Sequence, residues 1–208
     1  MSSNLTLSAL EIADTLRACG TPVASEQAGQ LSVYLDLLLR WNARTNLTAI
    51  RDPLTIVQRH FADSLFCASH IPQGARLVLD FGSGGGFPGI PAAIMRPDLS
   101  MTLTESQSKK SAFLREAVRT VAIEAEVWSH RVELMPAERQ FDCITLRAVD
   151  QMISACTVAA SRLTESGTLL AFSTERLRET VEQSLPSWHW SSMPLPYTEQ
   201  GLLLKASR

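Results

Sequence analysis

The chain has 208 residues, of which 45% are hydrophobic and 19% are charged, and its formal net charge is −2. This composition is typical of a soluble protein with one sizeable core, and no apolar run approaches the ~18 residues of a membrane-spanning helix. The N-terminus lacks a basic start, and Glu11 and Asp14 lie where a signal peptide needs an apolar stretch. We therefore expect a cytoplasmic protein with no membrane partner.

The slightly negative charge excludes binding of nucleic acid through a general basic excess, so such a partner would need a local patch. Candidate basic residues are Lys109, Lys110, Arg115, Arg119, Arg131, Arg139 and Arg147. A solvated face is the simpler interpretation of these residues. The four cysteines form no C-x-x-C pair and the four histidines lack metal-ligand spacing, so we expect reduced thiols and no metal site.

The first part of the chain, residues 5 to about 70, has a helical pattern. Leucines recur at helical spacing over residues 25–45, and Ser25 is a candidate N-cap. A second helix is expected after Pro53, because proline suits the first turn of a helix. The sequence IPQG at 71–74 has the chemistry of a turn. We therefore expect a helical cap over residues 1–72.

Residues 73–208 alternate between strand and helix patterns and predict an α/β domain. Strands are expected at 76–82, 101–106, 124–130, 141–148, 167–173, 188–195 and 201–207, and helices at 89–96, 107–123, 151–163 and 174–185. This alternation predicts right-handed crossovers and a mostly parallel sheet covered on both faces. No helix separates the last two strands, so we expect the final strand to run antiparallel. The two parts are expected to form one compact unit.

A glycine-rich loop follows the first strand, in DFGSGGGFPGIP at residues 80–91. In an open α/β sheet, ligands bind beyond the carboxyl ends of the strands, where this loop is expected to lie. Gly84, Gly86 and Gly89 match the dinucleotide fingerprint letter for letter, but that fingerprint opens directly at the strand end, and Phe87 occupies the third position counted from Gly82.

Two acids point to a ligand that carries positive charge and a ribose. Asp80 at the tip of the first strand would repel a pyrophosphate, whereas it suits the ammonium and sulfonium of S-adenosylmethionine. Gly82, Gly84 and Gly86 would allow close approach of the backbone to the methionine part. Glu105, at the end of the second strand, suits ribose hydroxyls, although an acid facing the dipole of the next helix is an alternative role.

Several longer motifs occur in order along the chain: LRWNARTNLTAIRDP, RHFADSL, DFGSGGGFPGIPAAIMRPD, TESQSKKSAFL, HRVE and TLRA. Over roughly residues 30–150 they resemble the small-subunit ribosomal RNA methyltransferase family that modifies N7 of a guanine in the 530 loop of 16S rRNA. The resemblance implies a class I S-adenosylmethionine-dependent methyltransferase with a Rossmann-like sheet. The implied partner is 16S rRNA, free or within the small subunit or an assembly intermediate, and a monomer is expected.

The resemblance also implies a set of site residues. Gly82 and Phe87 would line the donor pocket, and Val132 and Glu133 would border the adenine. Ser83 and Ser106 complete the expected donor site, and Arg131 and Arg147 would position the substrate. Without the resemblance, HRVE is a surface turn. Arg147 lies at the end of an apolar strand, where an unpaired guanidinium would be costly, so we expect it in the crevice rather than in a structural ion pair.

Residues of the cap and two departures from the family pattern qualify this interpretation. His60 and Asp63 share a helix face and are expected to bridge the cap to the rest of the chain rather than to act directly. Family members commonly have a lysine where this chain has Ser173 and Thr174, and many have an arginine where it has Gln200. These changes affect RNA affinity or the target more than donor binding.

The expected chemistry needs no catalytic acid or base. Guanine N7 exposes a lone pair with no proton to remove, so alignment with the methyl group suffices. Two alternatives remain: a non-catalytic or retargeted RNA-binding relative, and, from another class, an NAD-dependent oxidoreductase. Asp80 argues against the oxidoreductase. The sequence leaves open whether naked RNA or an assembled subunit is the substrate.

Overall fold

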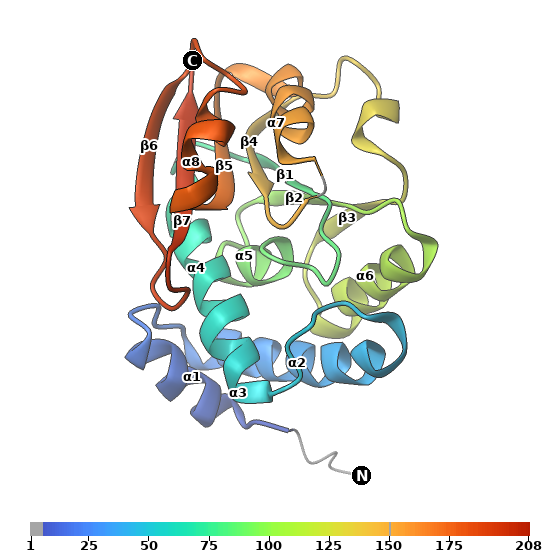
Figure 1. Cartoon of the computed structure of the whole chain (residues 1–208). Coiled ribbons are helices and arrows are strands. Elements are labelled where there is room, and N and C mark those ends of the chain that lie inside the picture. The colour runs from blue at the N-terminus through green and yellow to red at the C-terminus, as the bar shows by residue number, and fades with distance from the viewer. Residues whose placement is uncertain (1–5, 150) are drawn as a thin grey trace.

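The computed structural model describes residues 6–149 and 151–208, and its N-terminal part is helical as predicted (Figure 1). Its elements there are α1 (Ala9–Ala18), α2 (Ser25–Thr45), α3 (Pro53–Thr55), the π-helical segment η1 (Ile56–Phe61) and α4 (Ala62–Ser69). The helix expected after Pro53 is thus interrupted by a wider π-helical turn. None of the helices in the described residues is long and apolar enough to cross a membrane.

The N-cap expected for α2 was wrong by one residue. Ser25 is the first helical residue and Ala24 is the N-cap, without a side-chain hydrogen bond to the helix. Instead, the Gln27 side chain accepts a hydrogen bond from the Ala24 N–H at 2.9 Å and donates to the Ile94 and Met95 carbonyls at 3.2 and 3.3 Å. The start of α2 is therefore held by the end of α5 (Gly89–Met95), 67 residues away.

A seven-stranded sheet forms the centre of the molecule, in the order β3-β2-β1-β4-β5-β7-β6. The strands are β1 (Leu77–Phe81), β2 (Ser100–Thr104), β3 (Ala125–Trp128), β4 (Phe141–Leu146), β5 (Leu163–Thr174), β6 (His189–Pro194) and β7 (Gly201–Ser207). The first five strands pair in parallel, and β7 runs antiparallel to both β5 and β6. The predicted mostly parallel sheet with an antiparallel last strand is confirmed.

The largest difference from the predicted strand boundaries is at the start of β5. We expected a helix up to residue 163 and a strand from 167, but α7 (Met152–Ser161) ends earlier and β5 begins at Leu163. Residues 163–166 extend beside β4, whose pairing shifts register between Phe141 and Cys143. The polar Thr-Glu-Ser-Gly sequence resembles a turn locally, but sheet pairing decides its conformation.

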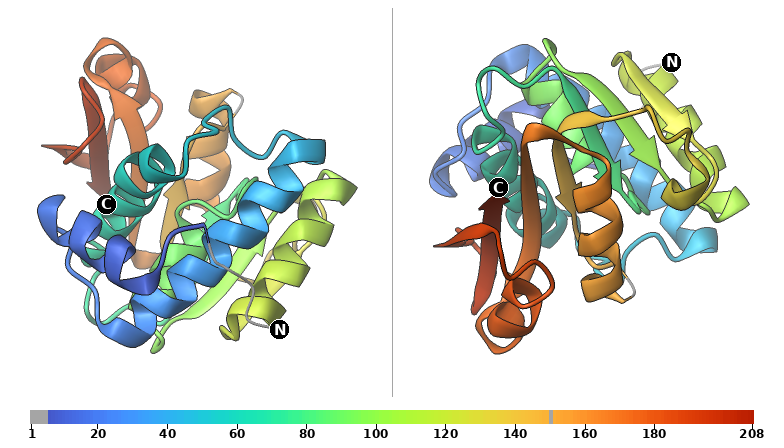
Figure 2. Two further views of the ribbon diagram at one scale, coloured as in Figure 1. Left: turned by 90° about the horizontal axis from the view of Figure 1, so that it is seen from below. Right: turned by 90° about the horizontal axis from the view of Figure 1, so that it is seen from above.

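Helices cover both faces of the sheet (Figure 2). One core cluster joins the N-terminal helices, α5, α6 (Ser108–Val121) and the sheet, and the other joins α7, α8 (Glu175–Glu182) and the opposite sheet face. Along β1, Val78 belongs to the first cluster and Leu79 to the second, as the alternation of a strand requires. Residues of the expected cap and of the α/β part therefore share one core.

Candidate active site

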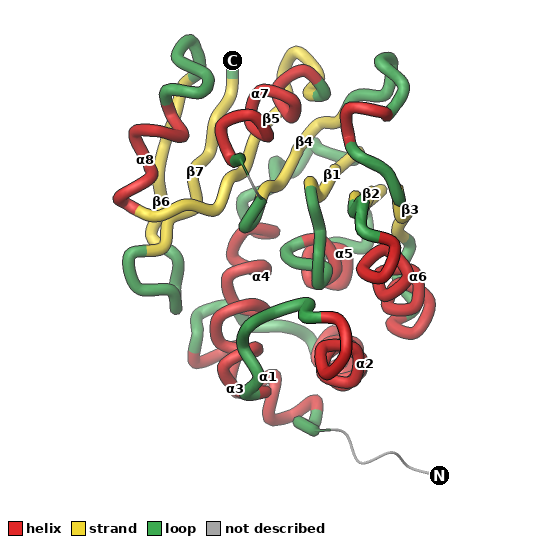
Figure 3. Tube along the Cα trace, turned by 45° about the vertical axis from the view of Figure 1, so that its right-hand side comes forward, coloured by secondary structure: helices red, strands yellow, loops and turns green. Residues whose placement is uncertain are grey.

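A cavity of about 770 Å³ lies at the carboxyl ends of β1, β2 and β4. Its lining comes from the loop after α2, the end of the π-helical segment η1, the glycine loop after β1, and the segments after β2, β3 and β4. Figure 3 shows the loop after α2 and the glycine loop between the cap helices and the sheet. The parallel register brings these segments to one edge, where α/β sheets bind ligands.

The glycine loop packs closely against neighbouring side chains. Gly82 has a φ of 72°, and a Cβ there would lie 2.9 Å from a Val149 methyl group. Gly86 has a φ of 90°, and a Cβ there would lie 2.5 Å from Ile90 Cδ1 and 2.8 Å from the Tyr34 hydroxyl. Both positions require glycine for backbone conformation and for space. The Tyr34 hydroxyl donates to the Gly85 carbonyl and ties the loop to α2.

The Asp80 side chain, which we expected to hold a cationic ligand, lies outside the lining of this cavity. Its Oδ1 accepts a hydrogen bond from Thr145 Oγ1 at 2.8 Å, and its Oδ2 accepts one from the Gly89 N–H at 3.1 Å. Burial raises its pKa to about 6. Asp80 shares its strand face with Val78, so its side chain turns towards α5 and fastens the glycine loop. Gly86 also lies outside the lining.

Glu105 follows β2 and lines the cavity, as expected for a group that holds ribose hydroxyls. Its Oε1 accepts a hydrogen bond from the Gln107 N–H at 2.7 Å, and Gln107 is the N-cap of α6. The alternative role at the helix N-terminus is therefore present as well. Among the described residues no donor reaches the second carboxylate oxygen, which leaves that oxygen for a ligand.

The segment after β3 borders the same cavity. Arg131, Val132 and Glu133 lead into a short 3-10 helix, Val132–Leu134, where Val132 is buried and Glu133 is exposed. HRVE is thus a surface turn, as its residues alone indicate, but Val132 packs inward and the turn borders the cavity. The indole N–H of Trp128 donates to the Arg131 carbonyl at 3.2 Å and holds the turn.

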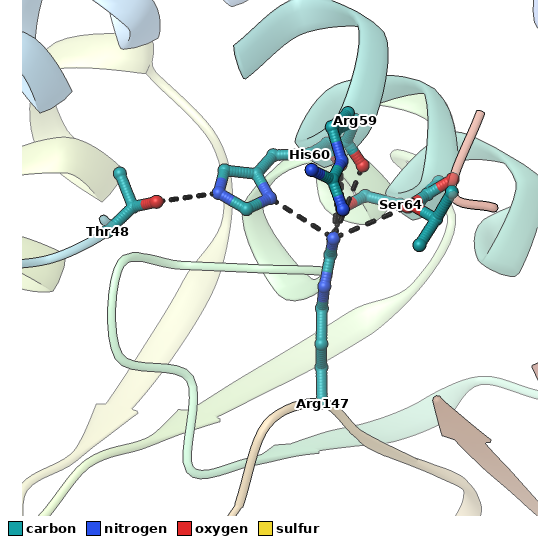
Figure 4. A network of polar contacts seen from close by, with 7 residues as sticks. Thr48, Arg59, His60, Ser64 and Arg147 are labelled. Atoms are coloured by element: carbon teal, nitrogen blue, oxygen red, sulfur yellow. Dashed lines mark hydrogen bonds and ion pairs between the residues drawn. The ribbon is translucent and has the colours of Figure 1, made fainter. Parts of the chain in front are cut away.

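Arg147 follows β4 and joins the cavity to the cap (Figure 4). Its guanidinium donates to the Arg59 and His60 carbonyls at 3.2 and 3.3 Å and lies 3.5 Å from the Asp63 carboxylate. These carbonyls belong to the π-helical segment, whose wider turn presents them to a side-chain donor. The guanidinium also stacks 4.8 Å from the Phe172 ring centroid. Arg147 therefore lines the crevice as predicted and forms a structural ion pair as well.

His60 continues this network towards the cavity. Its Nδ1 lies 3.1 Å from an Arg147 nitrogen, and its Nε2 lies 2.7 Å from Thr48 Oγ1. Burial, followed by the positive charges of Arg147 and Arg59, lowers the pKa of His60 to about 3, so the imidazole is neutral. Its ring lies 4.6 Å from the Phe87 ring. The contacts of His60 and Asp63 are those of the bridge between cap and sheet that we expected.

The structure brings most of the predicted site residues together around one cavity. The predicted residues in its lining are Gly82, Ser83, Gly84, Phe87, Glu105, Ser106, Arg131, Val132, Glu133 and Arg147. Sequence reasoning missed the contribution of the loop after α2, residues 47–50, and of Ser154, and it named Lys110 only as a candidate basic residue. The motif NLT at 46–48 was a signal for that loop, because it belongs to the strings that carry the family resemblance.

Of the seven candidate basic residues, Lys110, Arg131 and Arg147 line the cavity, together with Arg59 of the cap, whereas Lys109, Arg115, Arg119 and Arg139 lie outside its lining. Arg139 instead pairs with Glu126 and donates to Thr102 Oγ1 at 3.0 Å. The lining thus holds four basic residues and two acidic ones, Glu105 and Glu133, although the whole chain is slightly acidic.

The chain is similar to named relatives over most of its length. Residues 27–196 match the family model described as rRNA small subunit methyltransferase G. The ribosomal RNA small subunit methyltransferase G of Xanthomonas campestris pv. campestris strain B100 is 41% identical over 162 residues, which cover 77% of this chain and 76% of the relative. The Xylella fastidiosa strain M23 protein of the same name is 42% identical over 159 residues, covering 76% and 74%.

Solved structures agree on the fold. A ribosomal protein L11 methylase from Lactobacillus delbrueckii subsp. bulgaricus superposes with a TM-score of 0.61 at 17% identity, covering 73% of this chain and 79% of that one. A T. thermophilus 16S rRNA N2 methyltransferase in complex with AdoMet and guanosine gives 0.56 at 20% identity, covering 70% and 43%. The predicted class I methyltransferase fold is confirmed, and the chain belongs to the rRNA small subunit methyltransferase G family.

Proposed function

We propose that this chain transfers the methyl group of S-adenosylmethionine to N7 of a guanine in the 530 loop of 16S rRNA. Family membership makes it an S-adenosylmethionine-dependent rRNA methyltransferase. The observation that carries the proposal is that the glycine loop, Glu105 and Arg147 line one cavity beside the cap. The target atom, the 530 loop and the roles of individual residues are our inference.

The residues of the cavity fit the donor. Its volume of about 770 Å³ lies within the usual range for small-molecule sites. The second oxygen of Glu105 accepts from the ribose hydroxyls, and Val132 and Glu133 border the adenine. Gly82 and Gly84 let the loop backbone approach the methionine part closely. Asp80 acts one step away: it fastens this loop through Gly89 and Thr145.

Methyl transfer to N7 requires these residues only to align the two reactants. The bound donor supplies a methyl group on a sulfonium, and the thioether that remains is a good leaving group. The N7 lone pair forms the new N–C bond while the C–S bond breaks and its electrons remain on sulfur, so no proton moves. The neutral His60 and the fully engaged Arg147 are therefore positioning groups, and no side chain is assigned as an acid or base. Their hydrogen bonds hold the cap over the reacting atoms.

Recognition of the RNA falls to the rim of the cavity. Arg59, Lys110 and Arg131 would contact phosphates, whose attraction does not depend on base sequence. The target base must leave its stack to enter, as in the recognition of single-stranded loops. Ser173 and Gln200 remove two basic groups common in the family, and this favours a retargeted or silent relative as the second candidate. A cytoplasmic monomer acting on the small subunit completes the proposal.

The test uses labelled S-adenosylmethionine with small subunits, and with naked 16S rRNA, from a strain that lacks this gene. Cleavage specific for 7-methylguanosine then maps the label. Label at one guanine of the 530 loop supports the proposal and shows which substrate form is required. Donor binding without transfer to either substrate favours the second candidate.

A matched pair of variants tests the donor site. Glu105→Gln is expected to weaken donor binding roughly tenfold or more, because a charged acceptor of hydrogen bonds is lost. Glu138→Gln changes an exposed acid outside the lining and is expected to leave the affinity unchanged. Equal affinities in titrations of both variants would contradict the assignment of Glu105.

A further inference from the structure

The hydrogen bonds of Thr48 leave one polar hydrogen unassigned at the cavity. The backbone of Thr48 is held by the buried Asn42 amide, which accepts from its N–H and donates to its carbonyl, both at 3.0 Å. The hydroxyl oxygen receives the Ile50 N–H at 3.2 Å and faces His60 Nε2 at 2.7 Å. Thr48 also lines the cavity.

The direction of the bond between His60 and Thr48 follows from Arg147 (Figure 4). A guanidinium donates and never accepts, so the His60 Nδ1 that faces it carries the lone pair. In the neutral imidazole, the hydrogen is then on Nε2 and is donated to the Thr48 hydroxyl. The chain of donors runs from Arg147 through His60 to Thr48.

A threonine hydroxyl has two lone pairs and one hydrogen. Both lone pairs are engaged here, by His60 and by the Ile50 N–H. In the described part of the chain, no acceptor for the hydroxyl hydrogen is present. Thr48 is therefore a donor only, fixed in place and exposed to whatever occupies this end of the cavity.

The position of Thr48 favours the incoming base as its partner. The residues assigned to the adenosine lie after β2 and β3, whereas Thr48 lies in the loop of the cap that packs on the glycine loop, with a Gly85 Cβ position 3.3 Å from the Leu47 carbonyl. The same edge of guanine that carries N7 also carries O6, an acceptor, whereas adenine presents an amino donor there. A donor-only hydroxyl beside N7 therefore distinguishes these two purines.

We propose that the Thr48 hydroxyl donates a hydrogen bond to O6 of the target guanine and so selects guanine over adenine. This inference rests on the proposed function. Arg147 and His60 act as positioning residues. Because His60 donates to the Thr48 oxygen, that oxygen cannot accept a hydrogen bond from the amino group of adenine. A site built to bond one polar group rejects an analogue that lacks it more strongly than packing alone allows.

The test changes the RNA and the protein at the same contact. Full-length 16S rRNA made by splinted ligation, and assembled into subunits where the enzyme needs them, carries guanine, inosine or 2-aminopurine at the target. Inosine keeps O6, whereas 2-aminopurine lacks O6 and keeps N7. We expect wild-type single-turnover rates at saturating donor to be similar for guanine and inosine and roughly tenfold or more lower for 2-aminopurine.

Protein variants complete the cycle. Thr48→Val is expected to lower the rate on guanine by a similar factor and to show no further loss on 2-aminopurine, whereas Thr48→Ser retains the preference for O6. Thr45→Val, at the end of α2 and outside the lining, is the matched control and keeps the wild-type pattern. The comparison of RNAs needs no protein variant, so it holds even where Thr48→Val unfolds.

Three outcomes would overturn the inference. Wild-type rates that are equal for guanine and 2-aminopurine show that O6 is not read. Independent losses from Thr48→Val and from 2-aminopurine show that the two groups do not meet. A loss in Thr48→Val explained wholly by weaker donor binding in titrations assigns the hydroxyl to the donor. Absence of 7-methylguanosine in every wild-type reaction would instead remove the proposed function and this inference with it.

Discussion

Two fully buried carboxyl groups, Asp80 and Asp63, hold the two sides of the cavity in different ways. Asp80 receives neutral donors from its own neighbourhood in the sheet, Thr145 Oγ1 and the Gly89 N–H. Asp63 receives Thr198 Oγ1 at 2.6 Å from a segment 135 residues away and faces the Arg147 guanidinium at 3.5 Å. Among the described residues, its Oδ1 has no hydrogen-bond partner.

Asp80 thus makes local contacts within the sheet domain, whereas Asp63 makes long-range contacts between the cap and the rest of the chain. Burial raises the pKa of both acids, and at Asp80 short neutral hydrogen bonds offset part of that effect. At Asp63 the hydrogen bond from the Thr198 hydroxyl offsets the effect of burial first, and the charges of Arg147 and Arg59 follow. The glycine loop is thus fastened within the sheet, whereas Asp63 of the cap is joined to the distant Thr198 and to Arg147 at the cavity.

The largest effect is expected from removing the Arg147 guanidinium. Arg147→Met leaves Asp63 buried beside an apolar side chain, and breaking a buried ion pair in this way costs about 3–5 kcal/mol. Urea unfolding measures the loss. In an Asp63→Asn background the same substitution should cost much less, because the uncompensated charge is gone. Equal losses in both backgrounds would contradict the dependence of the cap on this pair.

Removing the local fastening should cost less. Asp80→Ala leaves two buried donors without an acceptor, and we expect a loss of roughly 1–3 kcal/mol in the free energy of unfolding. Asp80→Asn keeps one acceptor oxygen and is expected to lose less. If titrations showed that Asp80→Asn abolishes donor binding while stability stays unchanged, Asp80 would contact the donor directly, and the assignment of its role to the loop would be wrong.

A smaller loss is expected where α2 holds the glycine loop. Tyr34→Phe removes the hydrogen bond to the Gly85 carbonyl and keeps the ring among Phe61, Phe87 and Phe113. A single neutral hydrogen bond contributes about 1 kcal/mol, so the free energy of unfolding measured in urea should fall by about that amount. Donor affinity should fall modestly. Arg178→Ala is a control, since its pairs on α8 are exposed and are worth about 0–1 kcal/mol.

The pH dependence of stability below pH 7 should distinguish His60 from Asp80. The folded-state pKa of His60 is about 3, below its ordinary 6.5, so the unfolded chain binds the extra proton and stability falls as the pH drops below 6.5. The folded-state pKa of Asp80 is about 6, above its ordinary 3.8, so the folded chain binds the proton first and stability rises as the pH drops from 6 towards 4.

These contributions oppose each other between pH 6 and 4. Relative to the wild type, His60→Gln should become more stable as the pH falls through this range, because the favourable change at Asp80 remains. Asp80→Asn should become less stable, because the unfavourable change at His60 remains. Urea midpoints measured from pH 7 to pH 4 check both signs. Curves for His60→Gln that run parallel to the wild type would show that His60 titrates normally.

Much of the fold and of the site could be predicted because the signals are local. Alternating apolar runs and helical stripes predicted the elements, and the glycine loop placed the ligand at the carboxyl edge of the sheet. Glu105 and Arg147 were predicted from their places at strand ends. The cap motifs supplied the family. The predicted start of β5 and the predicted N-cap of α2 were wrong. Pairing with β4 decided the first, and the contact with α5 decided the second.

The sequence by itself determined the order of elements along the chain. It showed which segments form strands, where glycines allow tight turns, and which charged residues end the strands. Only the tertiary structure decided where those groups point. Alternation along β1 places Asp80 with Val78, but which face α5 covers is a property of the packed sheet. The bond between Arg147 and His60 joins residues 87 apart, and Thr48 becomes a donor only through that contact. Local periodicity encodes elements, whereas the roles of polar groups depend on partners that only folding brings near.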